Sequence, residues 1–130
     1  MTFGSLEYMR AKNFKDFNKA LHYWGAPTLN QVYADVKGNI GWKATGLAPK
    51  RSNWDGLYPV PGDGRYEWAG IWRGDEMPML LNPAQGFIAT ANAYNIPSDH
   101  PARDHKLGFE WTNPSRHQRI HEVLGRLPKV

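Results

Sequence analysis

The chain has 130 residues, which is enough for one domain with a core of its own. Its formal net charge is only +4 and its basic residues are interleaved with acidic ones, so no nucleic-acid partner is expected. No apolar run approaches the roughly 18 residues of a membrane-spanning helix, so no membrane partner is expected either. The lack of cysteine excludes disulfides and thiol chemistry.

The first predicted elements are two short helices. Residues 5–12 form a helical candidate, and Asn13 and Asp16 have the spacing of a capping box that opens a second helix. Apolar side chains then recur at steps of three and four and give the second helix one apolar face, made of Phe14, Phe17, Leu21 and Trp24. Gly25 and Pro27 end this helix, and we interpret it as an element that packs on a core.

A β-hairpin and a long irregular segment follow. Residues 31–36 alternate apolar and polar side chains, residues 37–39 supply turn chemistry, and residues 40–45 return as a second strand. Five prolines interrupt residues 46–85, which are expected to be a long Pro/Gly-rich loop with a short helix near 74–81. Compact free-standing domains rarely carry so long a loop, so this stretch is expected to lie across a larger body.

The last third of the chain predicts a strand, a loop and a helix. Residues 86–91 predict a short strand, and residues 93–112 are expected to be loop. Asn113 and Pro114 predict a helix start, with Asn as the N-cap and Pro at the first helical position. Helices flanking antiparallel strands, without an internal domain boundary, place the chain in the α+β class.

Four stretches stand in a specific order along the chain: NQVYADVKGNIG at 30–41, GLYPVPG at 56–62, EWAG at 67–70 and LNPAQGFIATAN at 81–92. This succession resembles the penicillin acylase (penicillin amidase) family of N-terminal-nucleophile hydrolases, and the resemblance covers roughly residues 8–124. It implies a sandwich of two stacked antiparallel sheets between helical layers. It also implies substrates that are amides with a hydrophobic acyl group, such as penicillins and acyl-homoserine lactones.

In that family one precursor is cut into two chains, and the new N-terminal Ser attacks the amide with its own α-amine as base. The resemblance implies that residues 1–130 are a single internal segment of this catalytic domain, without the nucleophile region. Ser52, followed by Asn53 and Trp54, is similar to the nucleophile's surroundings but lies in a stretch that resembles a part far downstream. This chain alone is therefore expected to be inactive, with the remaining precursor segments as partners and a periplasmic or secreted parent protein.

Asn92 is the first candidate site residue. Aligned through residues 86–88, it takes the place of the family's oxyanion-hole Asn, at the end of the strand after the Asn-Pro-x-x-Gly turn. Such chemistry needs a neutral, rigid N–H donor, and losing one costs about 3 kcal/mol of transition-state stabilisation. Taken without the resemblance, an Asn that simply ends a strand is the alternative. The family commonly has a second Asn directly after, where this chain has Ala93.

The resemblance implies two further site residues. Arg119, followed by Ile120, matches the family's Arg-[Ile/Val] pair, in which the Arg orients the catalytic groups; assignment to Arg116 stays open. By itself, an Arg on an amphipathic helix is usually solvated or ion-paired. Asp104 takes the place of an Asp that helps to bind a structural calcium, which suits hard oxygen ligands, and an exposed loop acid is the alternative. No cofactor is expected for the chemistry itself.

Two other classes of function stay open. An aromatic-rich binding or scaffold module would present tryptophans to a ligand such as a sugar, namely Trp42, Trp54, Trp68 and Trp72. A small zinc protein would use His100, His105, His117 and His121, although zinc normally needs three or four ligands with supporting groups. We also expect self-association or another chain, because the second helix's apolar face and the aromatic loop 54–72 should not all be buried in one copy.

Overall fold

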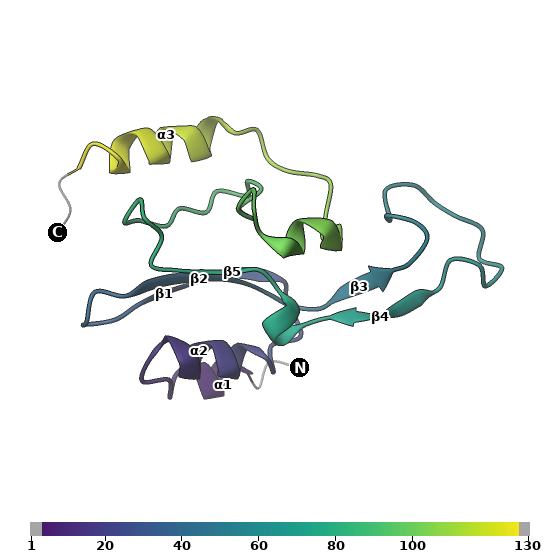
Figure 1. Cartoon of the computed structure of the whole chain (residues 1–130), viewed down its shortest axis with the longest axis horizontal. Coiled ribbons are helices and arrows are strands. Elements are labelled where there is room, and N and C mark those ends of the chain that lie inside the picture. Colours follow the sequence, from purple (N-terminus) through teal and green to yellow (C-terminus); the bar gives the residue numbers. More distant parts are fainter. Residues whose placement is uncertain (1–3, 128–130) are drawn as a thin grey trace.

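The computed structural model describes residues 4–127 and combines short helices with antiparallel strands (Figure 1). In chain order the elements are α1 (Gly4–Tyr8), α2 (Phe14–Leu21), β1 (Leu29–Ala34), β2 (Ile40–Thr45), β3 (Ala48–Arg51), β4 (Trp68–Trp72), the 3-10 helix η1 (Gly74–Glu76), β5 (Met79–Leu81), the 3-10 helix η2 (Pro101–His105) and α3 (Ser115–Leu124). This mixture confirms the α+β prediction. None of the described helices has the length and apolar character that crossing a bilayer requires.

A three-stranded antiparallel sheet in the order β1-β2-β5 divides the molecule. The predicted hairpin is confirmed, with its first strand two residues earlier than the predicted 31–36, because β1 pairs with β2 from Leu29 opposite Thr45 to Ala34 opposite Ile40. Figure 1 shows α1 and α2 on one side of this sheet, and the segment after β5 together with α3 on the other side. The sheet therefore separates a helical layer from the layer that carries the candidate site residues.

The helix α2 packs on the sheet through the face that the sequence predicts. The Asn13 side chain accepts a hydrogen bond from the backbone N–H of Asp16 at 2.9 Å, which confirms the predicted cap. Side chains along the helix then form one cluster with neighbouring aromatic rings, made of Phe17, Leu21 and Trp24 with Tyr8, Phe14 and Tyr33. A Cβ at Gly41 would collide with the Phe14 ring, so glycine in β2 is what lets this ring lie on the sheet.

The two surfaces for which a covering partner is predicted differ in their exposure. The apolar face of α2 is buried or partly buried within one copy. In the aromatic loop, Tyr58 and Trp68 keep 75% and 59% of their surface exposed. Within one copy, the loop therefore leaves apolar surface exposed that the helix face does not.

The expectation of a continuous loop over residues 46–85 was wrong. The strands β3 and β4 form an antiparallel two-stranded ribbon, and β5 joins the main sheet. Proline is tolerated in β3 because each strand of such a ribbon has a free edge. The helix expected near 74–81 shrinks to η1, because Pro78 holds Met77 in an extended conformation, which ends the helical turn.

The prediction of a strand at 86–91 was also wrong. These residues are irregular and pair with no strand in the described part of the chain. The helix α3 starts slightly later than predicted, because Pro114 occupies the cap position and Asn113 accepts a hydrogen bond from the backbone N–H of Ser115 at 3.0 Å. No side chain of α3 is buried, so this helix is attached to the rest by only a few contacts.

Candidate functional site

The turn that follows β5 fixes where the site segment leaves the sheet. The Asn82 side chain accepts a hydrogen bond from the backbone N–H of Ile40 at 3.0 Å and donates one to the Asn39 side chain at 2.9 Å. Asn82 has a φ of 49°, a left-handed conformation that Asn adopts more readily than most residues. The Asn-Pro-x-x-Gly stretch therefore starts from the closed end of the β1–β2 hairpin.

Asn92 is held by its backbone and by its side chain. Its φ is 57°, also left-handed, and its carbonyl oxygen accepts a hydrogen bond from the N–H of Thr112 at 3.0 Å. The Arg116 Nη2 atom donates to Asn92 Oδ1 at 2.9 Å and to the carbonyl oxygen of Ala91 at 3.1 Å. Since a guanidinium has donors and no acceptor, it fixes Oδ1 toward itself and leaves the Nδ2 donors facing elsewhere.

The structure does not bring the other site candidates to Asn92. Arg119 makes an exposed ion pair with Glu122 at 3.2 Å. The arginine that contacts Asn92 is Arg116. Asp104 lies exposed in η2. Ser52 lies in the loop between β3 and β4 and lines neither of the two cavities described below.

An apolar cavity of about 250 Å³ is lined from the residue after Asn92 onward. Ala93, the next residue in the chain, lines it, and so does Trp111, which precedes the Thr112 that bonds Asn92. Further apolar side chains complete the wall, among them Leu29, Leu47, Met77 and Ile96. Asn92 does not itself line this cavity, but it directly precedes Ala93 of the wall, and a polar amide next in the chain to an apolar wall suits a ligand in which a hydrophobic group adjoins a polar bond.

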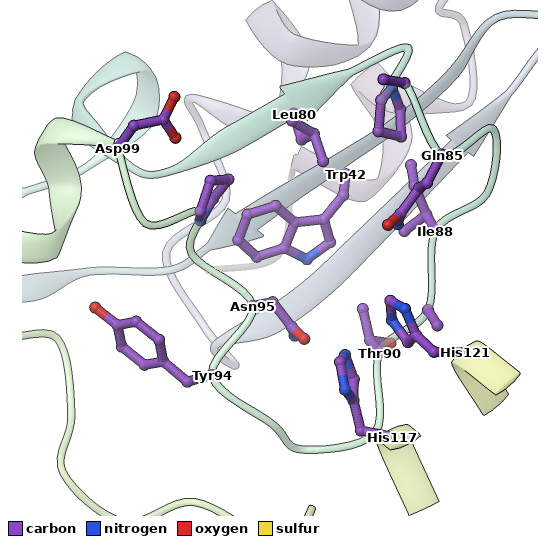
Figure 2. A pocket seen from close by; sticks show the side chains of 14 residues that line it. Trp42, Leu80, Gln85, Ile88, Thr90, Tyr94, Asn95, Asp99, His117 and His121 are labelled. Atoms are coloured by element: carbon purple, nitrogen blue, oxygen red, sulfur yellow. The ribbon is translucent and has the colours of Figure 1, made fainter. Parts of the chain in front are cut away.

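A second cavity, of about 580 Å³, has a more polar wall (Figure 2). Trp42 and Asn95 line both cavities and thus form part of a shared wall. Thr90 and Tyr94, which stand two residues before and two residues after Asn92, line the second cavity. Asn92 therefore lies at a point of the chain from which both cavities are within a few residues.

Two histidines of α3 face this polar cavity. The rings of His117 and His121 lie 4.2 Å apart between centroids, and His121 also meets the edge or face of Phe87 at 5.0 Å. Burial, with a smaller contribution from His117, lowers the pKa of His121 below its usual value. Neither imidazole hydrogen-bonds to the described part of the chain, so their ring nitrogens are available to a ligand.

The two rival classes of site find little support in the described residues. Between residues 4 and 127, no group of three or more His, Asp or Glu side chains is arranged to hold a metal ion. Of the four tryptophans that a binding module would present, Trp68 alone is exposed, whereas Trp42 is buried and Trp72 is stacked on His105.

Sequence reasoning favoured Arg119 and left Arg116, the residue that contacts Asn92, as the open alternative, and it missed both cavities. The cavities are formed by residues far apart in the chain, such as Trp42 and His117, so no local pattern reveals them. One signal was present for Arg116. The Asn113-Pro114 helix start places Arg116 in the first turn of α3, next to the segment that enters the helix.

Comparison with known proteins gives one consistent answer. A family model described as penicillin amidase matches residues 2–130. The chain is 38% identical over 124 residues to penicillin G acylase from Escherichia coli, a match that covers 94% of this chain and 14% of that protein. It is 38% identical over 117 residues to the acyl-homoserine lactone acylase QuiP from Pseudomonas fluorescens, covering 89% of this chain and 14% of that protein.

The structural comparison agrees with the sequence matches. The thermostable penicillin G acylase from Alcaligenes faecalis superposes with a TM-score of 0.69 at 28% identity, over 89% of this chain and 22% of that one. The chain thus spans only 14% of the length of the two curated relatives named above. On the family model and these identities, the chain belongs to the penicillin amidase family.

Proposed function

We propose that this chain is a segment of the nucleophile-bearing chain of a penicillin-acylase-type amidohydrolase. The parent enzyme would cleave the side-chain amide of penicillins or of other N-acyl substrates, including acyl-homoserine lactones. The observation that carries the proposal is the Asn92 amide, which Arg116 orients and which directly precedes Ala93 in the wall of an apolar cavity. In this assignment Asn92 supplies the oxyanion hole, Arg116 positions it, and the apolar cavity forms a wall of the acyl pocket.

The geometry of Asn92 suits the charge that develops during acyl transfer. Attack on an amide carbonyl moves negative charge onto its oxygen, which needs hydrogen-bond donors already in place. Binding of Oδ1 by Arg116 leaves the two Nδ2 protons free to donate to that oxygen. The bond from Thr112 to the Asn92 carbonyl holds the backbone at the same point, so the donor does not have to reorganise during the reaction.

Other segments of the precursor would complete the site. The nucleophilic Ser and the α-amine that serves as its base would come from upstream, and their chemistry needs no cofactor. Asp104 remains our candidate for a structural calcium ligand, and its exposed carboxylate is open to further oxygen ligands from other segments. A periplasmic or secreted parent protein is part of the same proposal.

Substitution of Asn92 in the full-length precursor tests the proposal. With penicillin G as substrate, we expect Asn92→Ala to lower kcat by roughly 10²–10³ with little change in KM, because the interaction forms in the transition state. Asn92→Asp should be at least as damaging, since it places negative charge against the oxyanion. Asn53→Ala is the matched control, because Asn53 donates to a loop carbonyl, that of Arg65. A normal kcat in Asn92→Ala would reduce Asn92 to a residue that shapes the backbone.

The isolated chain provides a second test. Without the upstream Ser, purified residues 1–130 should not hydrolyse penicillin G or long-chain acyl-homoserine lactones. Turnover by the isolated chain that survives Ser52→Ala would overturn the assignment of this chain as a segment without the nucleophile.

A further inference from the structure

The stretch that ends at Asn92 begins at a polar junction with the β1–β2 hairpin. The backbone N–H of Asn82 donates to the Ile40 carbonyl oxygen at 2.8 Å. The Asn82 side chain accepts from the Ile40 N–H at 3.0 Å and donates to Asn39 Oδ1 at 2.9 Å. Figure 1 shows the chain after β5 turning back over the sheet toward the layer that contains α3. Three hydrogen bonds to two adjacent hairpin residues therefore fix the point from which this stretch departs.

The side chains at the junction have a fixed order of donors and acceptors. Asn39 Nδ2 donates to Asp35 Oδ2 at 2.9 Å. The hydrogen bond from the Asn39 side chain, first among several, lowers the pKa of Asp35 to about 2, so the carboxylate is ionised and only accepts. Because Asn39 presents its donor to Asp35, its Oδ1 faces Asn82. Asn82 then has to direct Nδ2 to Asn39 and Oδ1 to the Ile40 N–H.

We propose that Asn82 is a positioning residue for Asn92, because it fixes the start of the segment 83–91 to the hairpin. The proposal rests on the function proposed above, in which Asn92 donates to the oxyanion. Asn82 lines neither cavity, so it has no contact with a substrate in this assignment. Its effect on turnover passes through the placement of Asn92.

The segment 83–91 depends on its two ends for its place over the sheet. It pairs with no strand in the described part of the chain. The Gly86 N–H donates to the Pro83 carbonyl oxygen at 2.8 Å, which closes a turn within the segment and reaches no other element. At the far end, Arg116 holds the Ala91 carbonyl and the Asn92 side chain. A loose start would therefore let the backbone before Asn92 shift even while the Arg116 contact persists.

Contacts with α3 do not replace this junction. The Phe87 ring meets the His121 ring of α3 at 5.0 Å between centroids, and Arg116 belongs to the same helix. No side chain of α3 is buried, so α3 itself is only weakly attached to the sheet. Among the described residues, the hydrogen bonds that join residues 82–92 directly to the sheet are those of Asn82.

The first test removes the Asn82 side chain and keeps its backbone conformation. Asn82→Gly in the full-length precursor permits the φ of 49° but loses both side-chain hydrogen bonds. With penicillin G we expect kcat to fall roughly ten-fold while KM stays within about two-fold. Asn13→Ala is the matched control, because it removes the α2 cap on the other side of the sheet. It should lower the thermal unfolding midpoint and leave kcat within about two-fold.

A double-mutant cycle shows whether the effect passes through Asn92. In the Asn92→Ala background, Asn82→Gly should cause almost no further loss of kcat, because the donor that it positions is already absent. A roughly ten-fold loss in both backgrounds would show that the two residues act independently, and it would overturn the positioning role.

Reversing the order of donors and acceptors provides a rescue that keeps the variant folded. Asn82→Asp tolerates the left-handed backbone, but two acceptors then face each other whichever way the Asn39 amide is turned. We expect kcat to fall roughly ten-fold. In the Asp35→Asn/Asn82→Asp double variant the carboxylate stands at the other end of the network, the Asn39 amide can turn over, and the bonds form with donors and acceptors exchanged. The kcat of this double variant should return to within about three-fold of the native value.

The outcomes separate the positioning role from the proposed function. If Asn92→Ala lowers kcat as expected and Asn82→Gly leaves it unchanged, the positioning role is wrong and the proposed function stands. A double variant that is no more active than Asn82→Asp alone also overturns the positioning role. If Asn92→Ala retains a normal kcat, the assignment of Asn92 to the oxyanion hole fails, and this inference fails with it.

Discussion

The two parts of this chain are held together by different kinds of contact. Residues 4–81 contain both sheets and the buried cluster of α2, so apolar burial and paired strands stabilise them. Residues 82–127 contain no strand, and their helix α3 buries no side chain. The second part buries few apolar residues, namely Ala91, Ile96 and Ala102. Individual hydrogen bonds also attach it, such as that from the Ile40 N–H to Asn82 and that from Arg116 to Asn92. The second part nevertheless carries every residue to which we assign a role in catalysis.

This difference separates stability from chemistry along the sequence. Burial of an apolar side chain contributes about 1.5–3 kcal/mol, whereas one hydrogen bond contributes about 0.5–1.5 kcal/mol net. Substitutions in the α2 cluster should therefore change the free energy of unfolding, and substitutions of Asn92 and Arg116 should change turnover. Single substitutions in each part test this separation of stability from turnover and measure its size.

The largest expected effect is on folding. Leu21 is 1% exposed at the centre of the α2 cluster, so Leu21→Ala removes buried methyl groups and leaves a cavity. We expect a loss of about 2–5 kcal/mol in the free energy of unfolding. Val123→Ala on α3 is the matched control, because Val123 is 40% exposed and should cost about 0.5 kcal/mol or less. Urea unfolding of the 130-residue chain measures both, and equal losses would contradict the division.

The same division explains which elements the sequence could predict. The apolar steps of α2 encode contacts inside residues 4–81, and both α2 and the hairpin form as expected. In the hairpin, the face of Val32 and Val36 is exposed, and Tyr33 of the opposite face packs on the α2 cluster. The strand expected at 86–91 has suitable side chains, yet it finds no partner within the described residues. A strand requires a hydrogen-bonding neighbour, which its own sequence cannot specify. The β3–β4 ribbon was missed because the prolines of this stretch argue against strands. The chain nevertheless contains both strands, and they pair with each other.

Lys43 is a buried residue of the first part whose ammonium group is not hydrogen-bonded within the described residues. Its side chain is 1% exposed in β2, and its Nζ atom has no hydrogen-bond partner among the described residues. Burial lowers the pKa of Lys43, and the charge of Asp75 partly opposes this shift. An unpaired buried ammonium costs folding free energy, so this position marks a local conflict within the better-packed layer.

A second pair of substitutions compares the roles of two arginines of α3 in turnover. Arg116→Ala should lower kcat of the full-length precursor by about ten- to a hundred-fold, because Asn92 loses the charged hydrogen bond that orients its amide. Arg119→Ala is the matched control on the same helix and should stay within about two-fold, since exposed ion pairs contribute little. The kcat of both arginine variants is measured with penicillin G, and the thermal unfolding midpoint of each variant is measured as well.

A positioning role for Arg116 has a specific signature. The fall should appear in kcat with KM and the unfolding midpoint unchanged, and Arg116→Lys should restore only part of it, because an ammonium lacks the planar fork of donors. A large kcat loss in Arg119→Ala, with normal turnover in Arg116→Ala, would return the supporting role to Arg119, the residue favoured by the sequence resemblance.

The smallest expected effect concerns the hairpin turn of the first part, where a polar group rather than burial contributes. Asp35 accepts hydrogen bonds from the Asn39 side chain, the Tyr33 hydroxyl and the backbone N–H groups of Lys37 and Asn39, at 2.9–3.0 Å. These bonds, with those from Asn39 first, outweigh desolvation and lower the pKa of Asp35 from 3.8 to about 2. Because the folded pKa is depressed, the stabilisation is complete above about pH 4 and is lost as the pH falls toward 2. The unfolding free energies of the native chain and Asp35→Asn should therefore converge between pH 5 and pH 2, measured by urea titration at each pH. A difference that stays constant over this range would show that the carboxylate charge does not stabilise the turn.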